Sequence, residues 1–274
     1  MNRQNLLSMA GNPVQPQINP GLVLLSTREL DKMRQVGRLA ANLLNHLESM
    51  VQPGVSTQAL NDEAARWMKS HDAISATLGY APPGYPPFTS SICTSVNEVV
   101  CHGIPNSKQI LKDGDIINID VTPILDGYHG DTSKTFLVGN VSATARKLVE
   151  VTQQSMMQGI AEIKPGARIG DIGAAIQEYA EANGFSVVRD MVGHGVGRQF
   201  HSDPQIPHYG KRGSGLNLRT GMVFTVEPML NEGTHTLKFL ADHWTVITKD
   251  KKLSAQFEHT VAVTKEGVEI LTLP

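Results

Sequence analysis

The chain has 274 residues, of which 40% are hydrophobic, and its formal net charge is −2. This composition predicts a globular protein of one large or two small domains, and the near-zero charge argues against bulk attraction to nucleic acid or to an anionic membrane. No apolar run approaches the roughly 18 residues that a membrane-spanning helix needs, and we find no pattern of a secretory signal. The two cysteines, Cys93 and Cys101, are too few for a disulfide framework, which predicts a cytoplasmic protein.

Residues 1–26 are predicted to form an irregular N-terminal arm. The segment contains Pro13, Pro16 and Pro20 among Asn and Gln residues, a composition that disfavours a packed core. Pro13 and Pro16 have the spacing of a polyproline ligand, but the motif is so short that a leader without fixed structure is the favoured interpretation.

Two amphipathic helices are predicted after the arm. Thr27 is an N-cap candidate for the first, and Pro53 and Gly54 end it. Its apolar residues recur at helical spacing: Met33, Val36, Leu39, Ala40, Leu43, Leu44 and Leu47. Ser56 or Thr57 caps the second helix. The apolar residues of this helix are Leu60, Ala64, Trp67 and Met68.

A β-hairpin is predicted over residues 116–136. Apolar and polar residues alternate from Ile117 to Val121, as in a strand with one buried face. Asp126-Gly127 is the strongest short signal for a two-residue turn, which needs positive φ at both positions. With this turn the numbers of paired residues sum to 253. Pro123 cannot donate a hydrogen bond and indicates a departure from the ideal ladder, such as a bulge.

The hairpin predicts a metal site. Its register makes Asp120 and Asp131 diagonal cross-strand neighbours on one face, roughly 7–8 Å apart at the backbone. Two carboxylates directed at one point repel each other unless a proton or a cation lies between them.

The chain also contains an internal repeat. Pro53-Gly54 recurs as Pro165-Gly166 at an offset of 112, and the segment 111–120 recurs as 218–227 at an offset of 107. A carboxylate, Asp120 or Glu227, ends both segments. Amphipathic helices resemble one another by chance, but the matched Pro-Gly and acidic positions make chance a poor explanation. Two halves, of about residues 27–140 and 141–274, predict a pseudo-twofold domain.

Three further residues are candidate metal ligands. His194 lies in the glycine-rich segment 193–197, Glu227 ends an apolar strand, and Glu258 shares a strand face with Thr260. Taken singly, each is more often a surface residue or a satisfied core residue. Together with the two aspartates they give four carboxylates and one neutral imidazole, which balance two divalent cations. The oxygen-rich set favours Mn, Fe(II) or Co, with zinc less typical.

At these residues the chain resembles the type I methionine aminopeptidases of the pita-bread fold, from about Thr27 to Leu273. The resemblance rests on motifs in one order: NEVVCHGIP at 97–105, NIDVT at 118–122, GDT at 130–132, GHGVG at 193–197, FTVEPM at 224–229 and QFEHT at 256–260. It implies an α+β fold with helices on a curved antiparallel sheet. The metal ligands of the family match Asp120, Asp131, His194, Glu227 and Glu258.

The resemblance further implies removal of the initiator methionine from nascent proteins with a small second residue. A hydroxide activated by two metals would attack the first peptide bond, with Glu227 as general base or proton shuttle. His201 would hydrogen-bond the scissile carbonyl and the developing oxyanion. His102 would contact the substrate near its N-terminus or its second residue. Without the motifs, His201 would be interpreted as a loop histidine and His102 as part of a capped turn.

The pocket for the methionine side chain is expected to be apolar, and the resemblance gives its walls as Cys93, Phe200, Met229 and Trp244. The segment 78–88 is longer than in the family.

Two alternatives therefore arise for the pocket aromatics. Spacing back from Cys93 indicates Tyr85 and Phe88, whereas the Leu-Gly-Tyr match indicates Tyr80, with Thr77 where many bacterial members have cysteine. We prefer Tyr85 and Phe88 and expect Tyr80 on a lid of the enlarged loop.

The implied partners are the N-termini of peptides and nascent proteins. We expect a monomer with no specific nucleic acid or membrane partner, and docking of the arm on the ribosome stays open.

The same fold also occurs with two rival functions. An X-Pro aminopeptidase or prolidase shares the fold but typically carries a longer N-terminal domain and extra histidines, which this arm does not supply. A non-enzymatic binding protein of the fold has lost metal ligands, whereas this chain keeps the whole set.

Overall fold

The computed structural model describes residues 22–274. The predicted arm, with its proline motif, therefore lies almost entirely outside the described residues. Among the helices of the described part, none is long and apolar enough to cross a membrane.

The chain is α+β, as predicted. The helices are α1 (Thr27–Glu48), α2 (Thr57–Ser70), α3 (Ala143–Ala161) and α4 (Ile169–Ala182). Strands from the first half are β1 (Ile74–Ser75), β2 (Cys93–Val96), β3 (Val99–Cys101), β4 (Ile116–Val121), β5 (Pro123–Leu125), β6 (Tyr128–His129) and β7 (Thr132–Leu137). Strands from the second half are β8 (Ser186–Val187), β9 (Gly193–Gly195), β10 (Ser202–Ile206), β11 (Val223–Val226), β12 (Met229–Asn231), β13 (Leu237–Phe239), β14 (Val246–Thr248), β15 (Ser254–Gln256), β16 (His259–Val263) and β17 (Val268–Ile270).

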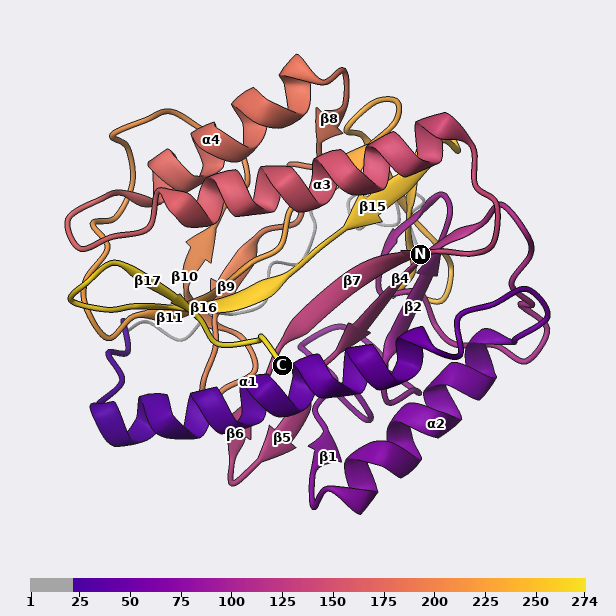
Figure 1. Cartoon of the computed structure of the whole chain (residues 1–274), viewed down its shortest axis with the longest axis horizontal. Helices are drawn as coiled ribbons and strands as arrows, with labels where there is room; N and C mark the ends of the chain where they lie inside the picture. Colours follow the sequence, from indigo (N-terminus) through magenta and orange to yellow (C-terminus); the bar gives the residue numbers. More distant parts are fainter. Residues whose placement is uncertain (1–21) are drawn as a thin grey trace, which may run out of the picture.

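The helices lie in pairs over the two halves of the strand layer (Figure 1). The largest sheets have the orders β2-β4-β7 and β10-β9-β11-β16-β17, and all their pairings are antiparallel. In the first half, leucines of α1 and α2 pack against Ile117 and Ile119 of β4. In the second half, α3 and α4 pack against Phe224 and Val226 of β11. Each half thus has a core of its own, made by one helix pair on one sheet.

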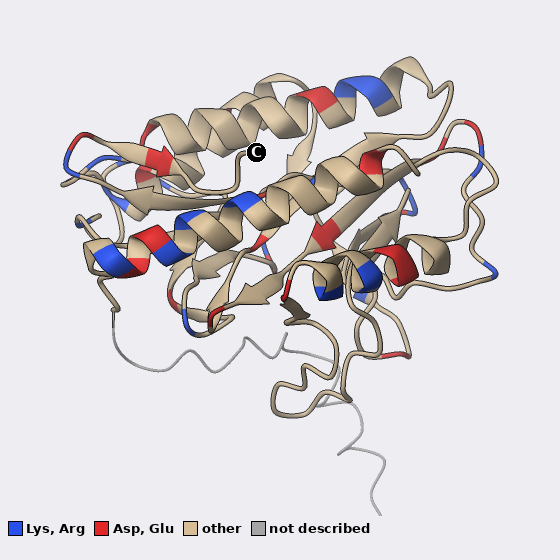
Figure 2. Cartoon of the chain, turned by 60° about the horizontal axis from the view of Figure 1, so that its bottom comes forward, with Lys and Arg blue, Asp and Glu red and all other residues tan. Residues whose placement is uncertain are grey.

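Charged residues stay on the outside of these helices. Lys, Arg, Asp and Glu residues are interspersed along α1 and α2 (Figure 2), while the opposite helix faces supply buried leucines. In this view neither helix presents a surface of a single sign.

Hydrogen bonds confirm the internal repeat. The Gly54 N–H donates to Leu111 O at 2.8 Å, and the Gly166 N–H donates to Leu218 O at 2.9 Å, at the predicted offsets. Both glycines have positive φ, +93° and +86°, which glycine adopts without steric cost. The same turn therefore connects the first and second helix in each half.

The hairpin has the predicted register. Asp120 pairs with Ser133 in β4 and β7, and Ile124 pairs with His129 in β5 and β6. The turn residues Asp126 and Gly127 have φ of 52° and 78°. The departure from an ideal ladder expected at Pro123 is confirmed, but it is not a bulge, because the register is the same on both sides of this residue. The chain instead leaves one sheet after β4 and joins another at β5.

The start and end of α1 differ from the sequence prediction. Ser26, not Thr27, is the N-cap, and it forms a capping box with Glu29. The helix ends at Glu48, before the predicted stop at Pro53. In a capping box the residue three positions before the acid is the cap, so the Glu29 spacing identifies Ser26. For α2, Ser56 is the N-cap, which is one of the two predicted alternatives.

A buried glycine of α1 gives a stability prediction. A Cβ at Gly37 would lie 2.3 Å from Leu271 O, a backbone atom near the C-terminus. We expect Gly37→Ala to lower the free energy of unfolding by about 1–3 kcal/mol, as overpacking does, although alanine favours a helix by about 1 kcal/mol over glycine. Urea unfolding measures this, with the exposed Gln35→Ala on the same helix as the neutral control. A Gly37→Ala variant more stable than wild type would show that the backbone contact yields.

Candidate metal centre and active site

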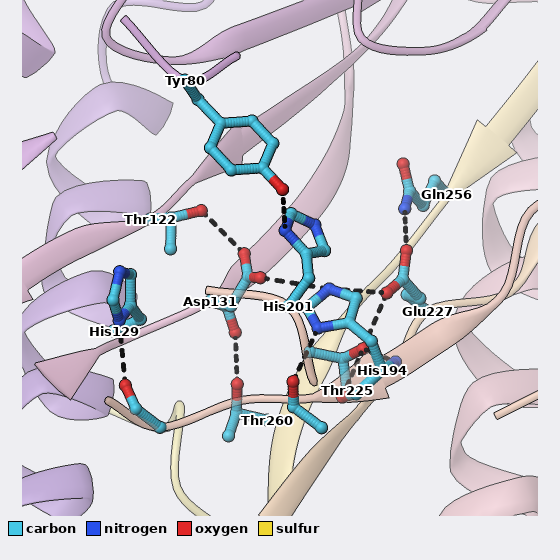
Figure 3. Close-up of polar contacts among 12 residues, drawn as sticks. Tyr80, Thr122, His129, Asp131, His194, His201, Thr225, Glu227, Gln256 and Thr260 are labelled. Atoms are coloured by element: carbon cyan, nitrogen blue, oxygen red, sulfur yellow. Dashed lines mark hydrogen bonds and ion pairs between the residues drawn. The ribbon is translucent and has the colours of Figure 1, made fainter. Parts of the chain in front are cut away.

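The predicted metal ligands come together where the two halves meet. Asp131, His194 and Glu258 each offer a ligand atom within 4.8 Å of the others. The His194 Nε2 lies 3.6 Å from a carboxylate oxygen of Asp131 and 3.6 Å from one of Glu227 (Figure 3). Asp120 is on β4 and lines the same cavity.

Backbone contacts across the halves fix two of these ligands. Glu258 forms a bridge with Ser133, whose carbonyl accepts from the Glu258 N–H at 2.9 Å. The Thr260 hydroxyl donates to Asp131 O at 2.7 Å. The carboxylates of Asp131 and Glu258 therefore belong to a hydrogen-bonded seam between the halves.

Side-chain donors orient the carboxylates themselves. The Thr122 hydroxyl donates to Asp131 Oδ1 at 2.8 Å, and the Thr225 hydroxyl donates to Glu227 Oε1 at 2.7 Å. Gln256 Nε2 donates to the other Glu227 oxygen at 3.3 Å. These donors were not predicted, yet a signal exists: each lies two residues from a ligand in sequence, which is the period of a strand face.

The site concentrates negative charge in a buried place. Burial raises the pKa of Asp120 to about 7 and the pKa of Glu227 to about 8. Burial, followed by the neighbouring carboxylates, raises the pKa of Asp131 and of Glu258 well above the ordinary range. Carboxylates so arranged are unfavourable as anions unless a cation offsets them.

The residues fit a metal centre. Asp120 Oδ1 is buried and has no hydrogen-bond partner within residues 22–274, a deficit that a cation would satisfy. Burial lowers the pKa of His194 to about 4, so the ring is a neutral ligand. The Nδ1 of His194 lies 3.1 Å from Gly195 O, so Nδ1 carries the proton and the lone pair of Nε2 faces the carboxylates. Such a hydrogen bond on the other ring nitrogen is typical of metal-bound histidines.

Two more histidines line the cavity. The ring of His201 lies 4.2 Å from that of His194, centroid to centroid, and its Nδ1 lies 2.9 Å from the Tyr80 hydroxyl. Burial, then His194 and His102, lowers the pKa of His201 well below its usual value. Burial lowers the pKa of His102 to about 4, and its ring lies edge-on to Trp244.

A cavity of about 420 Å³ opens beside the carboxylates. Trp244 contacts the rings of Tyr80, Tyr85 and Phe88, and its Nε1 donates to Pro86 O at 3.0 Å. The cavity includes every residue proposed for the methionine pocket: Tyr85, Phe88, Cys93, Phe200, Met229 and Trp244. Tyr80 and Thr77 line it as well, so the two sequence alternatives are not mutually exclusive.

The cavity is also lined by residues that were not predicted from the sequence. They are Pro82, Arg189, Asp190, Met191, Val192, Gln205, Pro207, Tyr209 and Phe239. No motif or spacing marks them, because they come from separate loops and strand ends.

Comparisons with known proteins find metallopeptidases. The model of metallopeptidase family M24 matches residues 31–265. The chain is 84% identical over 273 residues to methionine aminopeptidase B of Synechocystis sp., covering 100% of both. The crystal structure of methionine aminopeptidase from Rickettsia prowazekii has a TM-score of 0.89 and 52% identity, covering 92% of this chain and 100% of that one. Xaa-Pro dipeptidase from Bacillus anthracis is a more distant structural neighbour, with a TM-score of 0.72 and 22% identity, covering 91% of this chain and 61% of that one. This likeness shows a common fold only.

The fold and the buried carboxylate site define a metal-dependent peptidase, and the chain belongs to metallopeptidase family M24. Within this family its place is among the bacterial-type methionine aminopeptidases. The pita-bread fold and the metallo-exopeptidase class predicted from the sequence are thereby confirmed.

Proposed function

We propose that this chain removes the initiator methionine from nascent proteins whose second residue is small, by hydrolysis of the first peptide bond. Hydrolysis of an N-terminal methionine is the activity of the group to which the chain belongs. The observation that carries the proposed metal-dependent mechanism is the buried carboxylate cluster, in which Asp120 Oδ1 has no hydrogen-bond partner within residues 22–274.

The proposed cofactor is a pair of divalent cations. Four carboxylates carry four negative charges and His194 is neutral, so two divalent cations balance the cluster. The proposed ligands are Asp120, Asp131, His194, Glu227 and Glu258. Oxygen ligands with one imidazole nitrogen favour Mn, Fe(II) or Co over zinc. When bound, the ions would polarise the scissile carbonyl and lower the pKa of the attacking water.

The protein side chains would handle the proton and the oxyanion. Glu227 lines the cavity and is held by Thr225 and Gln256, which supports it as the general base or proton shuttle. His201 lies beside His194 at the cavity wall, where its ring would donate to the developing oxyanion. His102 would contact the substrate near its N-terminus.

The proposed methionine pocket is apolar. The rings of Tyr85, Phe88 and Trp244 pack together beside Cys93. A methionine side chain is long, unbranched and polarisable, which suits a deep apolar cavity.

This pocket predicts the order of substrates. Shortening methionine to alanine would forfeit roughly 2–3 kcal/mol of burial, or ~30–150-fold in kcat/KM. Lysine or glutamine would be buried without a partner, at a cost of several kcal/mol. We therefore expect kcat/KM on tripeptides X-Ala-Ser to be high for methionine and its isostere norleucine, lower for leucine and alanine, and undetectable for lysine.

The same series tests the proposed function. Trp244→Ala should flatten the order by opening the pocket to water. A wild-type enzyme that cleaves lysine or alanine as well as methionine would be a broad-range aminopeptidase. Cleavage of X-Pro bonds instead would assign it the chemistry of the more distant structural neighbour.

We further propose that residues 27–274 form a single catalytic domain preceded by an arm of residues 1–26. We propose that the protein acts as a monomer in the cytoplasm and meets its substrates at the ribosome. Ribosome co-sedimentation of the full chain and of a variant lacking residues 1–21 would test a role for the arm.

A further inference from the structure

We propose that Tyr80 is a positioning residue that fixes the tautomer of His201, so that the ring presents an N–H to the substrate carbonyl. The inference rests on the role proposed for His201. It connects Tyr80, in the wall of the methionine pocket, to the reacting bond through the His201 ring.

The hydrogen bond between the two side chains is the starting point. The Tyr80 hydroxyl lies 2.9 Å from His201 Nδ1, and the residues are 121 positions apart in the chain (Figure 3). Within residues 22–274 neither side chain makes another hydrogen bond. The Nε2 of His201 therefore has no protein partner in the described part of the chain, while the ring itself lines the cavity.

The direction of this hydrogen bond decides what Nε2 can do. A neutral imidazole has one nitrogen that donates and one that accepts. A phenol is a better donor than a neutral imidazole N–H, so the Tyr80 O–H donates to Nδ1. The ring proton then resides on Nε2, which becomes a donor for a carbonyl oxygen. In the opposite tautomer Nε2 would present a lone pair and repel the developing oxyanion.

Contacts of the Tyr80 backbone and ring hold this residue in place. The Tyr80 carbonyl accepts from the Phe88 N–H at 2.8 Å, and the Tyr80 N–H donates to Thr77 O at 3.0 Å. The Tyr80 ring packs edge-on against Phe200 at 5.1 Å between centroids. The loop 78–88 therefore closes on itself, with the phenol in contact with His201.

Removal of the hydroxyl tests the proposal. In the metal-loaded enzyme Tyr80→Phe should lower kcat for Met-Ala-Ser by about 3- to 10-fold, the typical effect of one neutral hydrogen bond, with KM changed less than twofold. KM should hold because the ring remains in the wall, and metal content should equal that of wild type. Tyr128→Phe is the matched control, since it loses a phenol hydrogen bond to Glu29 at 3.4 Å outside the cavity, and its kcat should be unchanged.

Two further measurements separate positioning from packing. Tyr80→Phe should cause no additional loss of kcat in a His201→Ala background, because the hydroxyl acts through the imidazole. In the diamagnetic zinc-loaded enzyme, ¹⁵N spectra of histidine should show His201 with its proton on Nε2. In Tyr80→Phe the same resonances should show a mixture of tautomers.

The outcomes distinguish the inference from the proposed function. If His201→Ala leaves kcat unchanged, the role proposed for His201 fails. If His201→Ala lowers kcat but Tyr80→Phe does not, or lowers it equally in both backgrounds, only the inference about Tyr80 is overturned. A wild-type spectrum with the proton on Nδ1 also overturns it.

Discussion

Asp120→Asn is expected to abolish turnover of Met-Ala-Ser, with kcat/KM reduced by roughly 10²–10⁴-fold. The amide has the shape of the carboxylate but lacks its charge, and removing one partner from a buried charged site costs about 3–5 kcal/mol. Asp120 Oδ1 is buried and has no hydrogen-bond partner within residues 22–274, a deficit that a cation would satisfy. Glu258→Ala should have the same effect, because its carboxylate lies within 4.8 Å of the ligand atoms of Asp131 and His194.

Metal analysis accompanies this experiment. We expect each variant to retain less metal than wild type, whereas the exposed Glu266→Gln should match wild type in metal and in rate. Exhaustive chelation of wild type should likewise stop turnover, with recovery on adding Mn or Co. Full activity after chelation would refute the two-metal proposal. In metal-free protein Asp120→Asn should not lower the melting temperature, because it removes one of several repelling buried charges.

His201→Ala is expected to reduce kcat by roughly 10²–10³-fold while metal content stays normal. The reason is that the ring would stabilise charge that appears only in the transition state, and the loss of one such donor typically costs this much. Single-turnover and steady-state rates on Met-Ala-Ser measure the effect. His235→Ala, which removes a histidine outside the cavity, is the control.

The result for His201 discriminates three roles. Loss of metal in the variant would make His201 a ligand, and an unchanged rate would make it a loop histidine that only packs against His194. A raised KM with unchanged kcat would indicate that the ring binds substrate and transition state equally.

Local rules were enough to predict part of this structure from the sequence. The hairpin register followed from Asp126-Gly127, because a two-residue turn fixes every pair behind it. The repeat was visible because the same turn, with a glycine at positive φ, occurs twice. The predicted N-cap of α1 was wrong by one residue. Ser26 and Thr27 are both good N-cap residues, and the contact with Glu29 determines that Ser26 is the cap.

The rest of the site depends on contacts between residues that are far apart in the sequence, which no local rule predicts. Tyr80 meets His201 across 121 residues, and the loop 78–88 has no spacing that determines which of its aromatic rings faces the cavity. The choice of Tyr85 and Phe88 over Tyr80 therefore could not be made by counting residues. Tyr80, Tyr85 and Phe88 all reach the cavity because the loop folds back, with the Gly79 N–H donating to Phe88 O at 2.8 Å.

The seam between Ser133 and Glu258 makes the proposed metal centre depend on two structural units, the first and the second half of the chain. Asp120 and Asp131 belong to the first unit, whereas His194, Glu227 and Glu258 belong to the second. Neither unit alone holds enough of the proposed ligands to balance two cations. A cation bound there favours the docked arrangement over the separated one by mass action. The ions proposed to support hydrolysis would thus also stabilise the association of the two units. Only a chain whose two units are correctly assembled would then be active.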